Sequence, residues 1–177
     1  KDLKAISYVK DITIISNGML LTKQLIDDLS AAGLTTLNIS VSAIDTRLAK
    51  QIMGTEAYTI EKIKEMLAYA AKHAHFKTII TPVMIQGINE QEMDKIIDFG
   101  ASIGCDVKIQ KFCSNKAGRN PVKEISWELF YNALEKLEQQ HHTKLKEEVY
   151  TLEQTKEYPC PFKRGERITA KIACNGR

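Results

Sequence analysis

The sequence predicts an α/β fold built on a parallel sheet. Short runs rich in β-branched residues alternate with longer amphipathic segments along most of the chain. Each amphipathic segment is long enough to form a helix, and strands joined through helices pair in parallel with right-handed crossovers. A further observation is that small polar residues stand at the ends of the strand runs, where ordinary turn residues are more usual.

Four segments are predicted as strands, namely residues 12–16, 36–44, 77–85 and 106–112. Each is a short apolar run between helical patterns, which is typical of a buried parallel strand. Their carboxyl ends should therefore meet at one edge of the sheet, where parallel α/β folds place their chemistry.

Four helices are predicted between and after these strands. Thr22, Thr59 and Ser126 each precede a helical pattern and are expected N-caps. Gly33 and Gly104 are expected to end the first and third helices. The expected buried faces consist of Leu25, Ile26 and Leu29; of Ile60, Ile63, Met66, Leu67 and Ala70; of the apolar residues in 89–103; and of Trp127, Phe130, Leu134 and Leu137.

The composition is that of an ordinary globular protein. The 177 residues are 44% hydrophobic and 27% charged, and a net charge of +3 does not by itself indicate a nucleic-acid or membrane partner. No run approaches the roughly 20 apolar residues of a membrane span, and no signal peptide opens the chain, so a cytoplasmic location without a membrane partner is expected. The four cysteines, Cys105, Cys113, Cys160 and Cys174, form no CxxC pair, so neither a disulfide framework nor a zinc site is predicted.

The polar strand ends predict a ligand-binding edge. The first strand ends in Ser16 and Asn17, and the second carries Asn38, Ser40 and Ser42 at alternate positions, which places the last three on one face of the sheet. Buried hydroxyls and amides are costly unless something polar meets them. Either a ligand meets these groups, or they bond to each other and to buried water.

The last predicted strand and the loop after it add further candidates. Lys108, Gln110 and Phe112 alternate onto one face of the strand, while Lys111 and Cys113 lie on the other. Lys116 and Arg119 follow in a loop of small residues, "FCSNKAGRNP", where they could bind a phosphate or carboxylate of a substrate. The alternative is a solvated loop whose charges bind nothing.

Three segments resemble those of radical S-adenosylmethionine (SAM) enzymes, and the pattern is most similar to that of the molybdenum-cofactor GTP 3′,8-cyclase. "ISNGML" resembles the TNG segment, "GLTTLNISVSAID" the segment with N-[IV]-S, and "VMIQGINEQEMDKIIDFGASIGCDVKIQKF" the segment that joins G-x-N-D-x-E to R-F-x-E-F. The resemblance covers residues 12 to about 112 and keeps the order of the three segments.

This resemblance implies a partial (βα)6 TIM-like barrel that holds SAM and a [4Fe–4S] cluster, whose reductive cleavage of SAM gives a 5′-deoxyadenosyl radical for hydrogen abstraction. By motif, Ser40 contacts SAM, and the alternative is a buried core serine. Ser16 lies near SAM or the substrate, and the alternative is a hydroxyl that caps its own turn. The remaining assignments are that Asn17 and Asn38 orient the site, that Ser42 stands where the family often has Asp, that Gln110 and Cys113 line the adenosyl pocket, and that Lys116 and Arg119 meet the substrate.

The sequence also departs from the family pattern. It contains neither the CxxxCxxC motif that ligates the cluster nor the GGEP-type segment that meets the SAM amino group. Both are expected upstream of Lys1, so no metal ligand is assigned within the chain. We therefore expect a fragment that is inactive alone, and no catalytic residue is assigned.

The predicted domains are residues 1–139, the C-terminal part of the barrel; 140–158, a helical linker; and 159–177, the start of a small β module similar to TRAM or OB modules. Basic residues run through this last segment, and RNA is an expected partner there. Cys160 and Cys174 are expected to be plain thiols, with an auxiliary cluster as the alternative. His141 is expected to be solvated.

A second hypothesis belongs to another functional class. The chain could be a non-redox α/β binding module whose basic tail binds nucleic acid through Lys163, Arg164 and Lys171, with a steep dependence on salt. It predicts that the parent protein has no cluster-binding cysteines.

Overall fold

The computed structural model describes residues 2–7, 9–115, 117, 120, 122–146 and 161–169. The chain divides into a unit from Lys1 to Glu147 and a unit from Glu148 to Arg177. In the second unit, the described residues 161–169 form an exposed turn and contain no strand. Glu166 closes that turn by donating its backbone N–H to the Lys163 carbonyl at 3.0 Å. The other residues of the predicted β module lie outside the described part of the chain.

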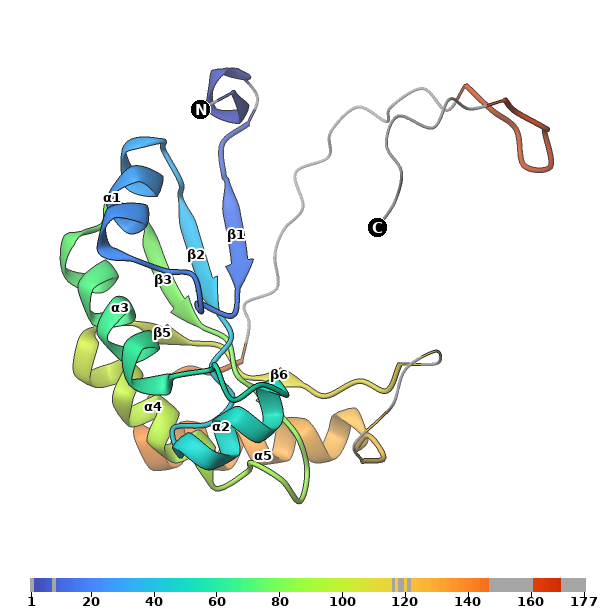
Figure 1. The fold of residues 1–177 in the computed structure, drawn as a ribbon. Helices are drawn as coiled ribbons and strands as arrows, with labels where there is room; N and C mark the ends of the chain where they lie inside the picture. The colour runs from blue at the N-terminus through green and yellow to red at the C-terminus, as the bar shows by residue number, and fades with distance from the viewer. Residues whose placement is uncertain are drawn as a thin grey trace. The chain divides into compact units, whose positions relative to one another are not determined.

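The larger unit is built on a parallel sheet, which confirms the predicted α/β fold (Figure 1). After a short 3-10 turn, Leu3–Ala5, the strands are β1 (Thr13–Ser16), β2 (Thr36–Ile39), β3 (Lys77–Ile80) and β5 (Asp106–Val107), in the order β1-β2-β3-β5. Two further strands, β4 (Val83–Met84) and β6 (Gln110–Lys111), pair in parallel beyond β3 and β5. Each pair is parallel, as expected for strands connected through helices.

The predicted strands 77–85 and 106–112 are each divided in two. Pro82 explains the division, because proline has no N–H to donate to the neighbouring strand. The hydrogen bonds in the other direction continue through the break, since the N–H of Gln110 donates to the Pro82 carbonyl at 2.8 Å. The register is the same on both sides of Pro82, so β3 and β4 act as one interrupted strand.

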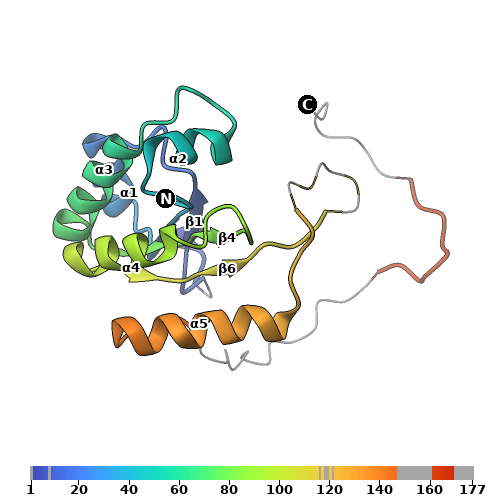
Figure 2. The same ribbon diagram turned by 90° about the horizontal axis from the view of Figure 1, so that it is seen from below.

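Helices α1 (Lys23–Ala31), α3 (Ile60–His73) and α4 (Glu92–Ile103) cover one face of the sheet (Figures 1 and 2). Thr22 caps α1 through its side chain, and Gly104 ends α4 in the left-handed conformation, both as predicted. Thr59 occupies the N-cap of α3 without a side-chain hydrogen bond. We call the face of the sheet opposite these helices the inner face.

Helix α2 (Thr46–Met53) is absent from the sequence-based prediction. It follows β2 and lies toward the carboxyl ends of the strands (Figure 1). Asp45 caps α2, because its side chain accepts the N–H of Leu48 at 2.8 Å. Gly54 ends the helix with φ of 68°, a backbone conformation that favours glycine.

Helix α5 (Trp127–His141) begins at the predicted cap Ser126 and buries Phe130 and Leu134. Trp127 is 55% exposed, so it does not belong to the buried face as predicted. His141 was expected to be solvated, yet its side chain is only 12% exposed and its Nε2 lies 2.7 Å from Asp94 of α4. Residues 142–146 lie beyond the end of α5, and residues 147–158 of the predicted helical linker are outside the described chain.

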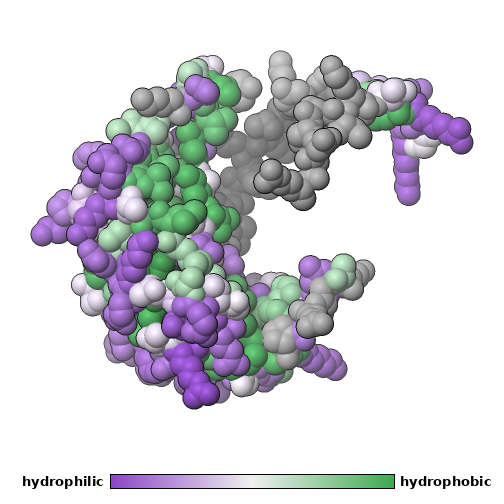
Figure 3. Space-filling model, viewed as in Figure 1, coloured by the Kyte–Doolittle hydropathy of each residue, from purple (hydrophilic) through white to green (hydrophobic). Residues whose placement is uncertain are grey.

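The two faces of β2 differ in character. Leu37, Ile39 and Val41 point toward the helices and are fully buried, whereas Asn38 and Ser40 point to the inner face and are partly buried. Figure 3 shows hydrophilic residues over the outer helices and apolar residues along the strand layer. None of the described helices is long and apolar enough to cross a membrane.

Candidate functional site

Residues of the inner face form rows across the strands, because paired residues in parallel strands share a face. The strand register gives the row Asn38–Ile79–Asp106, and the same register continued by two residues gives the row Ser40–Thr81–Lys108. Nearer the carboxyl ends, Val83 pairs with Gln110. The structure therefore brings the predicted residues of β2 and β6 to one face. Adjacent strands are about 4.8 Å apart, so a row of three residues spans roughly 10 Å.

Two oxygen atoms of these rows are buried without a hydrogen-bond partner in the described structure. They are Oδ1 of Asn38 and Oγ1 of Thr81, and a third such atom, Oγ1 of Thr78, lies on the helix side. An unpaired buried oxygen costs about 1–3 kcal/mol. The two on the inner face therefore favour a polar partner there.

Ser42 and Asn89 fasten the loop after β2 to β4. The Ser42 hydroxyl accepts the N–H of Val83 at 3.1 Å, where a backbone acceptor would otherwise stand. Asn89 is fully buried, and its amide nitrogen donates to the carbonyl oxygens of Ser42 at 2.7 Å and Val83 at 2.9 Å. Ser42 thus serves the architecture of the site through both its hydroxyl and its carbonyl.

Glu92 holds the same loop from α4. It is 2% exposed, and its Oε2 accepts the N–H groups of Ile44 at 2.7 Å and Asp45 at 2.8 Å. Lys95 donates to the other carboxylate oxygen at 2.6 Å. Burial alone would raise the pKa of Glu92, but these hydrogen bonds outweigh it and leave the pKa below its ordinary value.

The end of β1 forms a turn closed by its own side chains. The Ser16 hydroxyl accepts the N–H of Gly18 at 3.1 Å, and Oδ1 of Asn17 accepts the N–H of Met19 at 3.1 Å. Ser16 lies in register with the buried Ile39, on the face that packs toward the helices. Both predicted residues are thus engaged locally, and their roles toward a ligand stay predictions.

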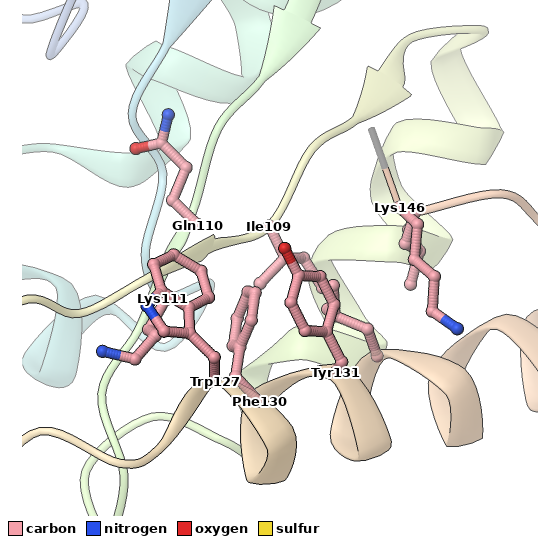
Figure 4. A pocket seen from close by; sticks show the side chains of 9 residues that line it. Ile109, Gln110, Lys111, Trp127, Phe130, Tyr131 and Lys146 are labelled. Atoms are coloured by element: carbon pink, nitrogen blue, oxygen red, sulfur yellow. The ribbon is translucent and has the colours of Figure 1, made fainter. Parts of the chain in front are cut away.

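The end of β6 places Gln110 and Cys113 on opposite faces of the strand, as expected. In Figure 4 the Gln110 side chain points away from Lys111 and from the aromatic residues of α5. Lys111 is buried beneath the Trp127 ring, with its Nζ 4.9 Å from the ring centroid, and the same Nζ lies 3.9 Å from the exposed Cys113 sulfur. A cavity of about 360 Å³ lies on this side of β6; its lining includes Lys111, Trp127, Phe130, Tyr131 and Lys146.

The loop after β6 is closed at its base by Glu124. Its carboxylate accepts the N–H of Ser114 and lies 3.6 Å from the Lys111 ammonium; these contacts lower the pKa of Glu124, the backbone hydrogen bond being the largest cause. The predicted substrate residues Lys116 and Arg119 lie outside the described residues.

The inner face suits SAM, which carries hydroxyl, amino, carboxylate and adenine groups. Asn38, Ser40 and Thr81 offer an amide and two hydroxyls, of which the Asn38 and Thr81 oxygens lack partners among the described residues. An iron–sulfur cluster needs several thiolate ligands. The described residues contain no group of three or more cysteine, histidine, aspartate or glutamate side chains that could hold a metal ion.

Sequence reasoning places Thr81 in the third strand and Asn89 at its end, but it does not predict the contacts of Asn89 and Glu92. The segment "GINEQE" contains Asn89 and Glu92, and both residues bind the loop after β2. For Thr81, the signal was a polar residue inside an apolar strand, directly before a proline.

Comparison with known proteins gives the family. The model of the radical SAM superfamily matches residues 1–100. An uncharacterised protein of Methanocaldococcus jannaschii is 28% identical over 94% of this chain and 44% of its own length. The GTP 3′,8-cyclase of Lactiplantibacillus plantarum is 36% identical over 55% of this chain and 27% of its own length. The chain thus spans less than half the length of these relatives.

Solved structures share the fold. Streptococcus suis SuiB bound to S-adenosylmethionine matches with a TM-score of 0.62 and 17% identity, over 75% of this chain and 31% of that one. Coproporphyrinogen III oxidase (HemN) of Escherichia coli matches with a TM-score of 0.56 and 14% identity, over 74% of this chain and 32% of that one.

Proposed function

The chain belongs to the radical SAM superfamily, and from that premise we propose that it holds SAM on the inner face of its sheet for hydrogen abstraction from a substrate. Enzymes of this superfamily use SAM and a [4Fe–4S] cluster, which supply a 5′-deoxyadenosyl radical when bound. The protein's own residues bind and orient the cofactor and exclude water. This membership disfavours the alternative of a non-redox binding module.

The observation that carries the proposal is that the buried oxygens of Asn38 and Thr81, beside Ser40, have no hydrogen-bond partner among the described residues. Ser40 and Asn38 hold SAM, and Asn17 and Ser16 shape the adjoining turn. Ser42 fixes the loop at the carboxyl edge through Val83. Gln110 lines the adenosyl side, and Lys116 and Arg119 meet the substrate. Cys113 lies on the opposite face of β6, beside Lys111, and is not part of this proposal.

We propose that the cluster ligands lie upstream of Lys1, in a longer protein of which this chain is a part and without which it is inactive. The chain covers 44% or less of the relatives described above, which supports this proposal. The substrate class we favour is a nucleotide or RNA. The similarity to a GTP 3′,8-cyclase supports a nucleotide, and the exposed Lys163, Arg164 and Arg167 support RNA.

The test uses the full-length protein, prepared without oxygen, and its Ser40→Ala variant. Ser40→Ala should weaken SAM binding about fivefold, since one hydrogen bond contributes about 1 kcal/mol. Calorimetry measures the affinity, and release of 5′-deoxyadenosine measures cleavage of SAM.

The matched control is Ser102→Ala. Its hydroxyl bonds to the Phe99 carbonyl on the exposed side of α4, so SAM affinity should not change. Equal SAM affinity in the Ser40→Ala variant and the wild type would remove Ser40 from the site. A full-length protein that neither binds nor cleaves SAM would overturn the proposed function itself.

A further inference from the structure

We propose that Lys111 is a positioning residue, which fastens both ends of the loop after β6 so that this loop can meet the substrate. The inference rests on the proposed function, which places Lys116 and Arg119 of the loop at the substrate. It assigns a task to a side chain that points away from Gln110 and therefore away from the proposed SAM site (Figure 4).

Lys111 carries one of two charges that are buried among the described residues, and the other belongs to Glu92. The side chain of Lys111 is only 2% exposed. Burying an ammonium costs free energy, and an apolar side chain of similar volume often serves stability equally well. A lysine at this position therefore needs a reason other than packing. Glu92 offers a parallel, because its charge holds the loop after β2.

The Lys111 ammonium contacts the residues that begin the loop. Its Nζ donates to the Phe112 carbonyl at 3.3 Å and lies 3.9 Å from the Cys113 sulfur. The strand pairing continues to this level, since the Phe112 N–H donates to the Met84 carbonyl at 3.2 Å. The loop therefore leaves the sheet from a fixed point at the carboxyl edge, directly after the residues that face the proposed SAM site.

The same ammonium contacts the residues that end the loop. It lies 3.6 Å from the Glu124 carboxylate and 4.9 Å from the centroid of the Trp127 ring, at the start of α5. The other oxygen of that carboxylate accepts the Ser114 N–H, which joins the end of the loop to its beginning. One buried cation thus holds both ends of the loop through an ion pair, a cation–π contact and a carbonyl.

Removal of this cation should loosen the loop and spare the fold. The Glu124 side chain is 44% exposed, so water can solvate its carboxylate once the ammonium is gone. Lys111→Met also keeps an unbranched side chain that can fill the buried space beneath Trp127. A contribution to the fold alone would appear in the stability of the whole protein, whereas a positioning role appears in the loop.

The test uses the full-length protein and measures how often the loop opens. Cleavage of a native protein by trypsin follows the population of the open form, and mass spectrometry identifies cuts after Lys116 and Arg119. Lys111→Met should raise the rate of these cuts about tenfold, as expected for the loss of a charged hydrogen-bonding group. Lys111→Arg keeps the cation and should restore the wild-type rate. The matched control is Lys50→Met, which removes the 3.1 Å ion pair with Glu56 elsewhere and should change nothing in the loop.

Calorimetry tests whether the anchored loop serves the substrate. GTP is the probe for a nucleotide, one of the favoured substrate classes. Lys111→Met should weaken GTP binding about threefold to fivefold and leave SAM affinity unchanged, because the loop acts on the substrate and the SAM residues lie on the other face. Urea unfolding should give the same midpoint for Lys111→Met and the wild type.

Unchanged cleavage after Lys116 and Arg119 in Lys111→Met would overturn the positioning role. A rise in cleavage along the whole chain, with an earlier urea midpoint, would also overturn it, because Lys111 would then serve the fold. A wild-type protein that binds SAM and no GTP would remove the nucleotide as substrate, while the cleavage rates would still decide the role of Lys111. If Lys111→Met does not fold, Glu124→Gln tests the same contact from its exposed side and should raise the cleavage about threefold.

Discussion

The two faces of strand β2 carry different kinds of side chain, apolar on the helix side and polar on the inner face. On the helix side, Leu37 and Ile39 are completely buried among apolar side chains. On the inner face, Asn38 and Ser40 alternate with them, and Asn38 carries a buried oxygen without a partner in the described chain. The contrast teaches that successive residues of one strand can serve stability and binding separately, because strand alternation sends them to opposite sides.

Truncating neighbouring residues on the two faces of β2 tests this difference most directly. Ile39→Ala should lower the free energy of unfolding by about 2–5 kcal/mol, because it leaves a cavity in a fully buried site. Asn38→Ala should change it by less than about 1 kcal/mol, because the truncation also removes an unpaired buried oxygen. Urea unfolding measures both, and similar losses for the two variants would refute the division between faces.

Glu92 of α4 binds the loop after β2 at the edge of the inner face, and replacing it measures how much this contact contributes to stability. Glu92→Gln should cost about 2–3 kcal/mol at pH 7, because two backbone N–H groups and Lys95 lose a charged acceptor. Urea unfolding at pH 7 and pH 3 measures the effect, and Glu61→Gln, whose partner Lys64 is an exposed surface contact at 3.4 Å, should cost almost nothing.

The effect of Glu92 should depend on pH. Its pKa is lowered in the folded protein, so its contribution is complete above the unfolded value of about 4.3 and is lost as the pH falls through the folded pKa. The stability difference between the wild type and Glu92→Gln should therefore shrink at pH 3. A difference independent of pH would show that the charge of Glu92 contributes nothing.

Gly100 tests the packing of the helix side at one position. A methyl group added there would lie 2.5 Å from Cγ2 of Val107 and 3.1 Å from the carbonyl oxygen of Cys105. Gly100→Ala should therefore cost about 1–3 kcal/mol through overpacking of α4 against β5. Thermal unfolding should show a smaller loss in Gly100→Ala combined with Val107→Ala than the sum of the single changes, and additive losses would contradict the clash.

Sequence patterns predicted the strands and the longer helices because apolar periodicity and capping residues can be read within one short segment of the sequence. Thr22 and Ser126 cap their helices as expected. Helix α2 was missed although Asp45 and Gly54 bracket it, since an eight-residue helix gives only a short periodic pattern. The break at Pro82 is also local, and the proline itself was visible in the sequence.

The candidate site could be predicted only in part. Alternation along β2 put Asn38 and Ser40 on one face, in agreement with the strand register, but the hydroxyl of Ser42 bonds to Val83, 41 positions further along the chain. The row beside Thr81 also depends on pairing between distant strands. Contacts between residues distant in the sequence leave no pattern within a short segment. Resemblance to a family, by contrast, could indicate that a ligand binds at the inner face.

The anchoring of the loop after β2 has a consequence for the order of folding. Asn89 and Glu92 bind residues 47 and 48 positions earlier in the chain, so their contacts close a loop that contains α3 and β3. Contacts between such distant residues pay loop-closure entropy before they stabilise anything. We expect this edge of the site to be completed late in folding, so that weakening the two anchors speeds unfolding more than it slows folding.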